Sequence, residues 1–172
     1  ISHIQVFQEK DISRFKELGV VANFQPLWAI RDEYITEHTY KKLGKKRSRW
    51  LYPIGSVHRS GAKIGFGSDW YVTSVNPLDG IEAAVTRLEP NGLTNIPLGK
   101  NEEIDLATAI RAYTLNGAFV NFLDHKVGSI EVGKQADIIV LNNNLFDIPS
   151  AEINETKVLA TLFNGILVYG EL

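Results

Sequence analysis

Short apolar runs that each follow a glycine are the feature that most limits how this chain can fold. Residues 20–22 (VVA) and residues 62–66 (AKIGF) are two such runs. Runs of this length and composition are typical of strands buried on both faces, as in parallel sheets. Helix-compatible segments precede them at residues 8–18 and 33–60. This alternation of helix and strand predicts an α/β fold with a parallel sheet.

Two further helices are indicated by their starting residues. Pro77 is placed as a first-turn proline for a helix that runs to about Leu88. Asp105 is a plausible N-cap for a helix that continues to Tyr113. The loop between these helices, residues 89–101, carries proline and glycine, and we interpret it either as a lid or as a simple connection.

The character of the chain changes to strands from about residue 126. Residues 137–141 (DIIVL) are apolar and largely β-branched, and Asn164-Gly165 separates two more apolar runs. Asn-Gly between apolar runs predicts a β-hairpin, because both turn positions require positive φ. We therefore assign residues 1–125 to one domain and residues 126–172 to a small β-rich domain.

Composition narrows the class of protein. The 172 residues are 44% apolar, enough for one core of ordinary size or for the tail of a larger one. The net charge of −2 gives no bias towards nucleic acid or anionic lipid. The absence of cysteine excludes disulfides and thiolate zinc sites within these residues. With no long apolar stretch or signal pattern, we expect a cytoplasmic protein with no membrane or nucleic-acid partner.

Residues 1–4 (ISHI) have no polar lead-in and resemble the interior of a secondary-structure element, so we expect the chain to be part of a longer protein.

A dense basic run at residues 41–49 (KKLGKKRSR) is followed by Trp50 and Tyr52. The run admits two interpretations, a nucleic-acid patch or a solvated helix face. The net charge favours the solvated face.

Two residues at expected strand ends could bind a metal. His3 stands beside a strand start, and Asp69 follows the strand at residues 62–66. In a parallel barrel the C-terminal strand ends converge on one site, and imidazole and carboxylate both suit a divalent metal. Their separation fits two βα units of about 30 residues each. Gly-Ser-Asp is also common turn chemistry, so the spacing alone leaves a structural role open.

Motif-like residues occur in segments spread over the whole chain. These are Ser2-His3-Ile4-Gln5, Gly19-Val20-Val21 leading to Gln25-Pro26, Gly67-Ser68-Asp69, Ala84-Val85-Thr86-Arg87, residues 112–118 (AYTLNGA) and residues 128–137 (GSIEVGKQAD). In this order they resemble the C-terminal half of the amidohydrolase superfamily, especially its YtcJ-like branch of metal-dependent hydrolases. The last two segments are the most specific.

The resemblance implies that residues 1–125 form strands six to eight of a (β/α)8 TIM-type barrel, and that residues 126–172 join a small β-sandwich shared with the N-terminal segment of the full protein. By the same resemblance, His3 matches the metal-ligand histidine of strand six. Asp69 matches the strand-eight aspartate that binds metal and acts as general base. Gln25 and Trp70 fall in the substrate pocket by position.

The implied activity is hydrolysis of C–N bonds in small amides or cyclic amides. A divalent metal, expected to be one or two zinc ions in the full protein, lowers the pKa of a water to about 7. Asp69 then accepts the proton of that water and passes it to the leaving amine. The expected partner is a small-molecule substrate.

Part of the family's metal set has no counterpart among these residues. The histidines are His3, His38, His58 and His125, and no two of them form the first-strand His-x-His motif. Catalytic zinc usually has three protein ligands, so we expect this chain alone to be inactive. The alternative is a non-catalytic interaction or regulatory module on the same scaffold. A partial barrel also exposes strand edges, so we expect homo-oligomers.

Overall fold

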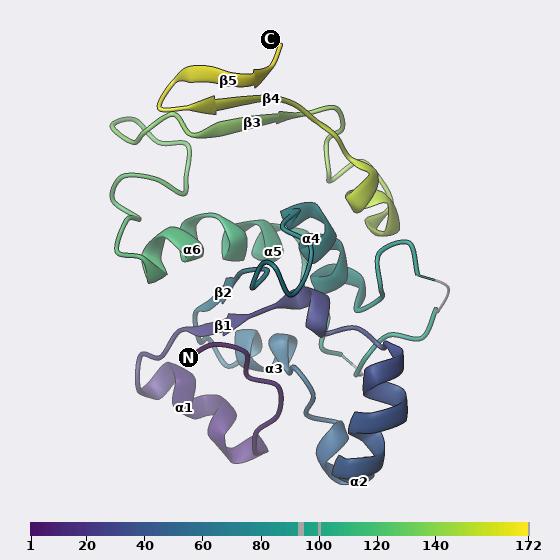
Figure 1. The fold of residues 1–172 in the computed structure, drawn as a ribbon. Coiled ribbons are helices and arrows are strands. Elements are labelled where there is room, and N and C mark those ends of the chain that lie inside the picture. The colour runs from purple at the N-terminus through teal and green to yellow at the C-terminus, as the bar shows by residue number, and fades with distance from the viewer. Residues whose placement is uncertain (93–94, 100, 172) are drawn as a thin grey trace.

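The computed structural model describes residues 1–92, 95–99 and 101–171 (Figure 1). Helical and extended elements alternate through the first two thirds of the chain. In chain order the elements are η1 (Glu9–Asp11), α1 (Ile12–Glu17), β1 (Ala22–Phe24), η2 (Pro26–Trp28), η3 (Tyr34–Thr39), α2 (Tyr40–Ser48), α3 (Ile54–Arg59), β2 (Ile64–Phe66), α4 (Pro77–Thr86), α5 (Leu106–Tyr113), α6 (Leu115–Val120), β3 (Ile138–Leu141), η4 (Ser150–Glu155), β4 (Val158–Phe163) and β5 (Ile166–Gly170).

The N-terminal part is an α/β structure built around a small parallel sheet. β1 and β2 pair in parallel, with Asn23 level with Gly65. On the other side of β1, Ser2 forms a parallel bridge with Asn23. Three chain segments therefore run side by side in the same direction, which confirms the predicted α/β class and its parallel pairing.

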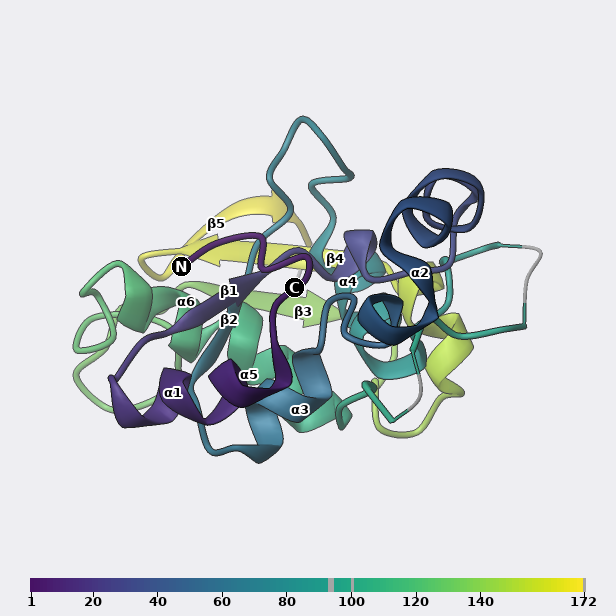
Figure 2. The ribbon, with the colours of Figure 1, turned by 90° about the horizontal axis from the view of Figure 1, so that it is seen from below.

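Helices cover both faces of the parallel strands. In Figure 1, β1 and β2 lie between a layer of α1, α2 and α3 and a layer of α4, α5 and α6, and Figure 2 shows the first layer from outside. Phe24, Ile64 and Phe66 of the strands are buried together with Ile54 of α3 and Ala109 of α5. The strands are short and apolar because both of their faces lie in this core.

Some element boundaries differ from the sequence prediction. The first strand begins at Ala22, so residues 20 and 21 precede it. The helical stretch expected at residues 33–60 is three pieces: the π-helical turn η3, then α2, then α3. Gly44 breaks the helical geometry of α2 with φ 72° and ψ 163°. Pro53 stands immediately before α3. Proline lacks a backbone N–H group, so it fits the start of a helix better than its interior, and the helix begins anew after it.

Local start and turn signals are confirmed. Pro77 occupies the first turn of α4, and the Asp105 side chain caps α5 by accepting a hydrogen bond from the Thr108 backbone N–H at 2.8 Å. Asn164 and Gly165 have φ of 51° and 78° in the turn between β4 and β5. The loop expected at residues 89–101 includes residues 93, 94 and 100, which lie outside the described residues.

The C-terminal part forms an antiparallel sheet in the order β3-β4-β5. This sheet lies beyond the α4–α6 layer (Figure 1). The segment between β3 and β4 returns to the α/β part, where η4 packs on α4. Every residue of β5 is exposed. Among the described residues, no helix is both long and apolar enough to span a membrane.

Candidate active site

Three of the predicted site residues lie at one edge of the parallel strands. His3 directly follows the bridge residue Ser2, and Gln25 directly follows β1. Asp69 comes three residues after the end of β2. The register sets Ser2, Asn23 and Gly65 at one level, and the chain leaves all three segments in the same direction. The fold therefore places all three residues after the carboxyl ends of neighbouring parallel segments, and their functional roles stay predictions.

Two of these residues have an unusual backbone conformation. His3 has φ of 72° and Asp69 has φ of 52°, both in the left-handed region that favours glycine. The His3 backbone is held in place because its N–H donates to the Asn23 carbonyl at 3.0 Å. Such conformations cost about 1–3 kcal/mol and cluster at active sites and ligand clamps.

The His3 ring is held from two directions. Its Nδ1 lies 3.0 Å from Oε1 of Gln25. Its face stacks on Trp28 of η2, with ring centroids 4.9 Å apart and planes only 6° from parallel. Because an amide oxygen can only accept, this contact requires the proton on Nδ1 and leaves the Nε2 lone pair unused. The ring therefore presents Nε2 as a ready metal donor.

Trp28 contacts His3 and was not among the predicted site residues. The turn that carries it is closed by a hydrogen bond from the Trp28 backbone N–H to the Gln25 carbonyl at 2.9 Å. The same turn thus delivers both Gln25 and Trp28 to His3. A motif Gln-Pro-x-Trp after a strand is the sequence signal, but it becomes informative only once His3 is known to lie beside it.

Asp69 and Trp70 lie in an exposed loop after β2. The Ser68 hydroxyl accepts from the Trp70 backbone N–H at 3.1 Å, and the Asp69 carbonyl accepts from the Val72 N–H at 2.8 Å. Within the described ranges, no hydrogen bond or ion pair engages the Asp69 carboxylate. It is therefore free to act as a ligand or base. Trp70 is 68% exposed, and its assignment to substrate binding stays a prediction.

The donors at this edge suit a divalent metal in kind but are few in number. His3 offers an imidazole nitrogen and Asp69 a carboxylate, both ordinary ligands of zinc. Among the residues that the structure describes, no group of three or more His, Cys, Asp or Glu side chains could hold a metal ion. Two donors fall short of the usual three protein ligands.

Arg87 is the most deeply buried charged residue near the core. It was expected inside a helix, but it is the left-handed C-cap of α4, with φ of 60°. Its Nε donates to the Leu98 carbonyl at 2.9 Å and its Nη2 to the Leu51 carbonyl at 3.3 Å. Burial lowers the pKa of Arg87 to about 10. These hydrogen bonds give Arg87 a structural role, because they join the end of α4 to two other segments.

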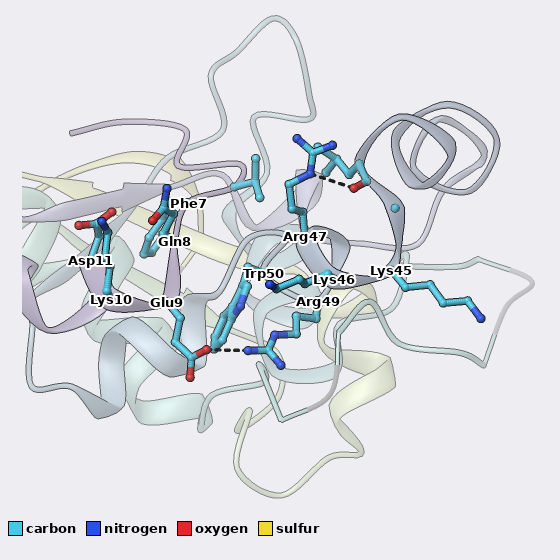
Figure 3. Close-up of a pocket in the computed structure, with 13 residues that line it drawn as sticks. Phe7, Gln8, Glu9, Lys10, Asp11, Lys45, Lys46, Arg47, Arg49 and Trp50 are labelled. Carbon is cyan, nitrogen blue, oxygen red and sulfur yellow. Dashed lines mark hydrogen bonds and ion pairs between the residues drawn. The ribbon is translucent and has the colours of Figure 1, made fainter.

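An open pocket of about 1030 Å³ lies away from these residues, between residues 6–11 and the end of α2 (Figure 3). It borders the basic run. Arg49 forms an ion pair with Glu9 at 2.6 Å across the pocket, and Arg47 donates to the Leu43 carbonyl at 2.9 Å. All six basic side chains of the run are exposed. The run is therefore exposed to solvent, and its interpretation as a solvated helix face stays a prediction.

The comparison with known protein families decides the relationship. The model of the "Amidohydrolase family" matches residues 1–169. The chain belongs to the amidohydrolase family. This result confirms the resemblance on which the sequence prediction rested.

Named relatives match between 69% and 98% of the chain. Protein LONG AFTER FAR-RED 3 of Arabidopsis thaliana is 35% identical over 171 residues, which is 98% of this chain and 28% of that protein. N-substituted formamide deformylase of Arthrobacter pascens is 31% identical over 119 residues, 69% of this chain and 21% of that protein. Putative amidohydrolase YtcJ of Bacillus subtilis is 27% identical over 97% of this chain and 31% of that protein. The amidohydrolase chain thus spans less than a third of each relative.

Solved structures share the fold. A metal-dependent hydrolase of Pyrococcus horikoshii, described as uncharacterized, superposes with a TM-score of 0.74 at 26% identity, over 87% of this chain and 30% of that one. A Xanthomonas campestris adenosine deaminase with bound zinc superposes with a TM-score of 0.67 over 98% of this chain and 36% of that one. At 19% identity the second likeness concerns the fold alone.

Proposed function

We propose that this chain is the C-terminal part of a metal-dependent hydrolase that cleaves C–N bonds in small amides or cyclic amides. In this proposal residues 1–125 supply strands six to eight of a (β/α)8 barrel, and residues 126–172 supply strands of a composite β-sandwich. The observation that carries it is the 3.0 Å contact between His3 Nδ1 and Gln25 Oε1 at the carboxyl edge of the parallel strands, with Asp69 in the loop that leaves β2 at that edge.

Each residue has a defined task in the proposed reaction. His3 and Asp69 would hold a divalent ion, together with ligands from the rest of the protein. Such an ion, with zinc as the best candidate, would supply an acidified water and polarise the scissile carbonyl. The Asp69 carboxylate would take the proton of the attacking water and return it to the departing amine nitrogen.

The names of the relatives support this reaction class. A deformylase that acts on N-substituted formamides breaks the bond between a carbonyl carbon and nitrogen. The metal-dependent hydrolase from Pyrococcus horikoshii supports a metal. The protein's own substrate is proposed only as a small amide, with Trp70 as a candidate pocket residue.

The first test is metal content. Elemental analysis would compare the full-length protein that contains this chain, its Asp69→Asn variant and residues 1–172 alone. We expect about one or two zinc-like ions in the full-length protein and none in the isolated chain. With formamide and cyclic amide substrates, we expect Asp69→Asn to lower kcat by about 10²–10⁴-fold, because the general base is lost.

A metal-free full-length protein without amidase activity would overturn the proposal. In that case the non-catalytic interaction or regulatory module would be the better description. The protein would then keep the arrangement of residues at the strand ends but would not catalyse hydrolysis.

A further inference from the structure

We propose that Gln25 is a positioning residue that fixes the tautomer of the neutral His3 ring, so that Nε2 is the nitrogen available to the metal. This inference rests on the proposed function for its purpose, although the hydrogen bond on which it depends is independent of any metal. This role differs from the substrate contact that the position of Gln25 in the sequence suggested.

The Gln25 side chain lies in the protein interior. Its side chain is only 3% exposed, and it immediately follows β1, whose residues Ala22 and Phe24 are fully buried. A buried amide oxygen needs a donor, and His3 Nδ1 at 3.0 Å is the one that the structure provides. The amide is therefore placed to act on the ring and is poorly exposed to a substrate.

Trp28 restrains the His3 ring in the plane that makes this contact. Trp28 stacks flat on the imidazole face, which restricts the plane of the ring. The backbone of the same turn ties Trp28 to Gln25 through a 2.9 Å hydrogen bond. The donor and acceptor are thus held together by one local element, which is a good basis for a fixed tautomer.

The His3 imidazole can exist as two neutral tautomers. A neutral imidazole carries one proton, and in water neither nitrogen is fixed as the protonated one. A proton on Nε2 would block the nitrogen that points away from Gln25. A hydrogen-bond acceptor that faces Nδ1–H disfavours this tautomer. Mutation of a residue that hydrogen-bonds a metal-binding histidine in this way typically changes metal affinity by about 10–100-fold.

The decisive experiment is ¹⁵N NMR of the His3 ring in the metal-free full-length protein, at a pH where imidazole is neutral. We expect Nδ1 to be protonated and Nε2 unprotonated in the wild type. Gln25→Leu should give a mixture or the Nε2-protonated form, because the acceptor is gone. Gln25→Glu should restore the wild-type pattern, because a carboxylate also only accepts.

Zinc titration provides the second readout. Gln25→Leu should weaken zinc binding by about 10–100-fold, and Gln25→Glu should bind within a few-fold of wild type or more tightly. Gln8→Leu is the matched control, because Gln8 is an exposed glutamine outside the His3 contact. It should change neither readout.

An Nε2-protonated ring in the wild type, or a tautomer unchanged in Gln25→Leu, would overturn the inference. Equal unfolding temperatures of the three variants would separate positioning from a general loss of structure. If the full-length protein binds no zinc at all, the proposed function fails, and the NMR arm still decides whether Gln25 sets the tautomer.

Discussion

Asp69 combines a free carboxylate with a strained backbone, and these two properties can be separated by mutation. Its φ of 52° is unfavourable for a side chain with a Cβ and easy for glycine. The residue follows Gly67-Ser68 in an exposed loop, so few other contacts depend on it. The native aspartate therefore carries a conformational cost that its chemistry must justify.

We predict that Asp69→Gly is more stable than Asp69→Ala by about 1 kcal/mol, because only glycine avoids the left-handed penalty. Both variants should lose the proposed activity, since neither has a carboxylate. Urea unfolding of the two proteins measures the difference. Equal stabilities would show that the loop relaxes out of this conformation at little cost.

In the core, the Arg87 side chain joins separate segments of the chain. We predict that Arg87→Met lowers the free energy of unfolding by about 3 kcal/mol, because the Leu98 and Leu51 carbonyls lose a charged donor. Denaturant unfolding measures this loss. Arg14→Ala, which removes an exposed ion pair with Asp11, should change stability by less than about 1 kcal/mol.

At the scale of elements, α4 and η4 meet through a buried carboxyl group. Glu82 of α4 is 3% exposed and accepts a hydrogen bond from the Asn154 backbone N–H at 2.9 Å. Burial raises the pKa of Glu82, and the nearby Asp79 and Glu155 add to this rise against the Asn154 hydrogen bond. In the described part of the chain, the Asn154 Oδ1 and the Thr156 hydroxyl at this joint are buried without a hydrogen-bond partner.

We predict that this joint makes stability depend on pH. A raised carboxyl pKa means that the folded state binds the proton more tightly than the unfolded state. The contribution of protonated Glu82 to the free energy of unfolding is thus fully present below about pH 4.5. It is lost as the pH rises through the pKa of Glu82 in the folded state. Glu82→Gln keeps an acceptor for Asn154 and removes the titration. Its stability should therefore fall less than that of wild type between pH 4 and pH 7.

Equilibrium unfolding of both proteins over this range tests the prediction, and identical pH profiles would contradict it. Glu82→Ala serves as a comparison. It should cost about 1–3 kcal/mol at neutral pH, because the buried Asn154 N–H loses its partner.

At the scale of the whole molecule, residues 1–172 leave apolar sheet surface uncovered. In the β4–β5 hairpin, Phe163 is 63% exposed, Ile166 67% and Val168 58%. The far edge of β5 has no strand partner among the described residues. An exposed apolar strand at a sheet edge is a template for pairing with another chain.

We predict that the isolated chain self-associates through this surface. Light scattering should give a mass above that of one chain of 19.2 kDa. Val168→Lys should shift the population towards monomer, because a charge on an edge strand opposes pairing. A clean monomer for the unmodified chain would contradict the prediction.

The sequence by itself determined the features that depend on neighbouring residues. Pro77 and Asp105 start their helices, and Asn164-Gly165 turns the hairpin, because these effects need only a ring, a carboxylate or a permissive φ within a few residues. The order of helices and strands likewise followed from the spacing of apolar side chains. The family resemblance added the roles expected of His3 and Asp69.

Only the tertiary structure decided which distant groups meet. The Gln25 contact with His3, the carbonyls bound by Arg87 and the Glu82 joint with Asn154 all join residues far apart in the chain. The breaks in the stretch at residues 33–60 are local by contrast, because Gly44 and Pro53 disfavour a helix interior. Long-range contacts require the whole core to form, and local composition carries no record of their geometry.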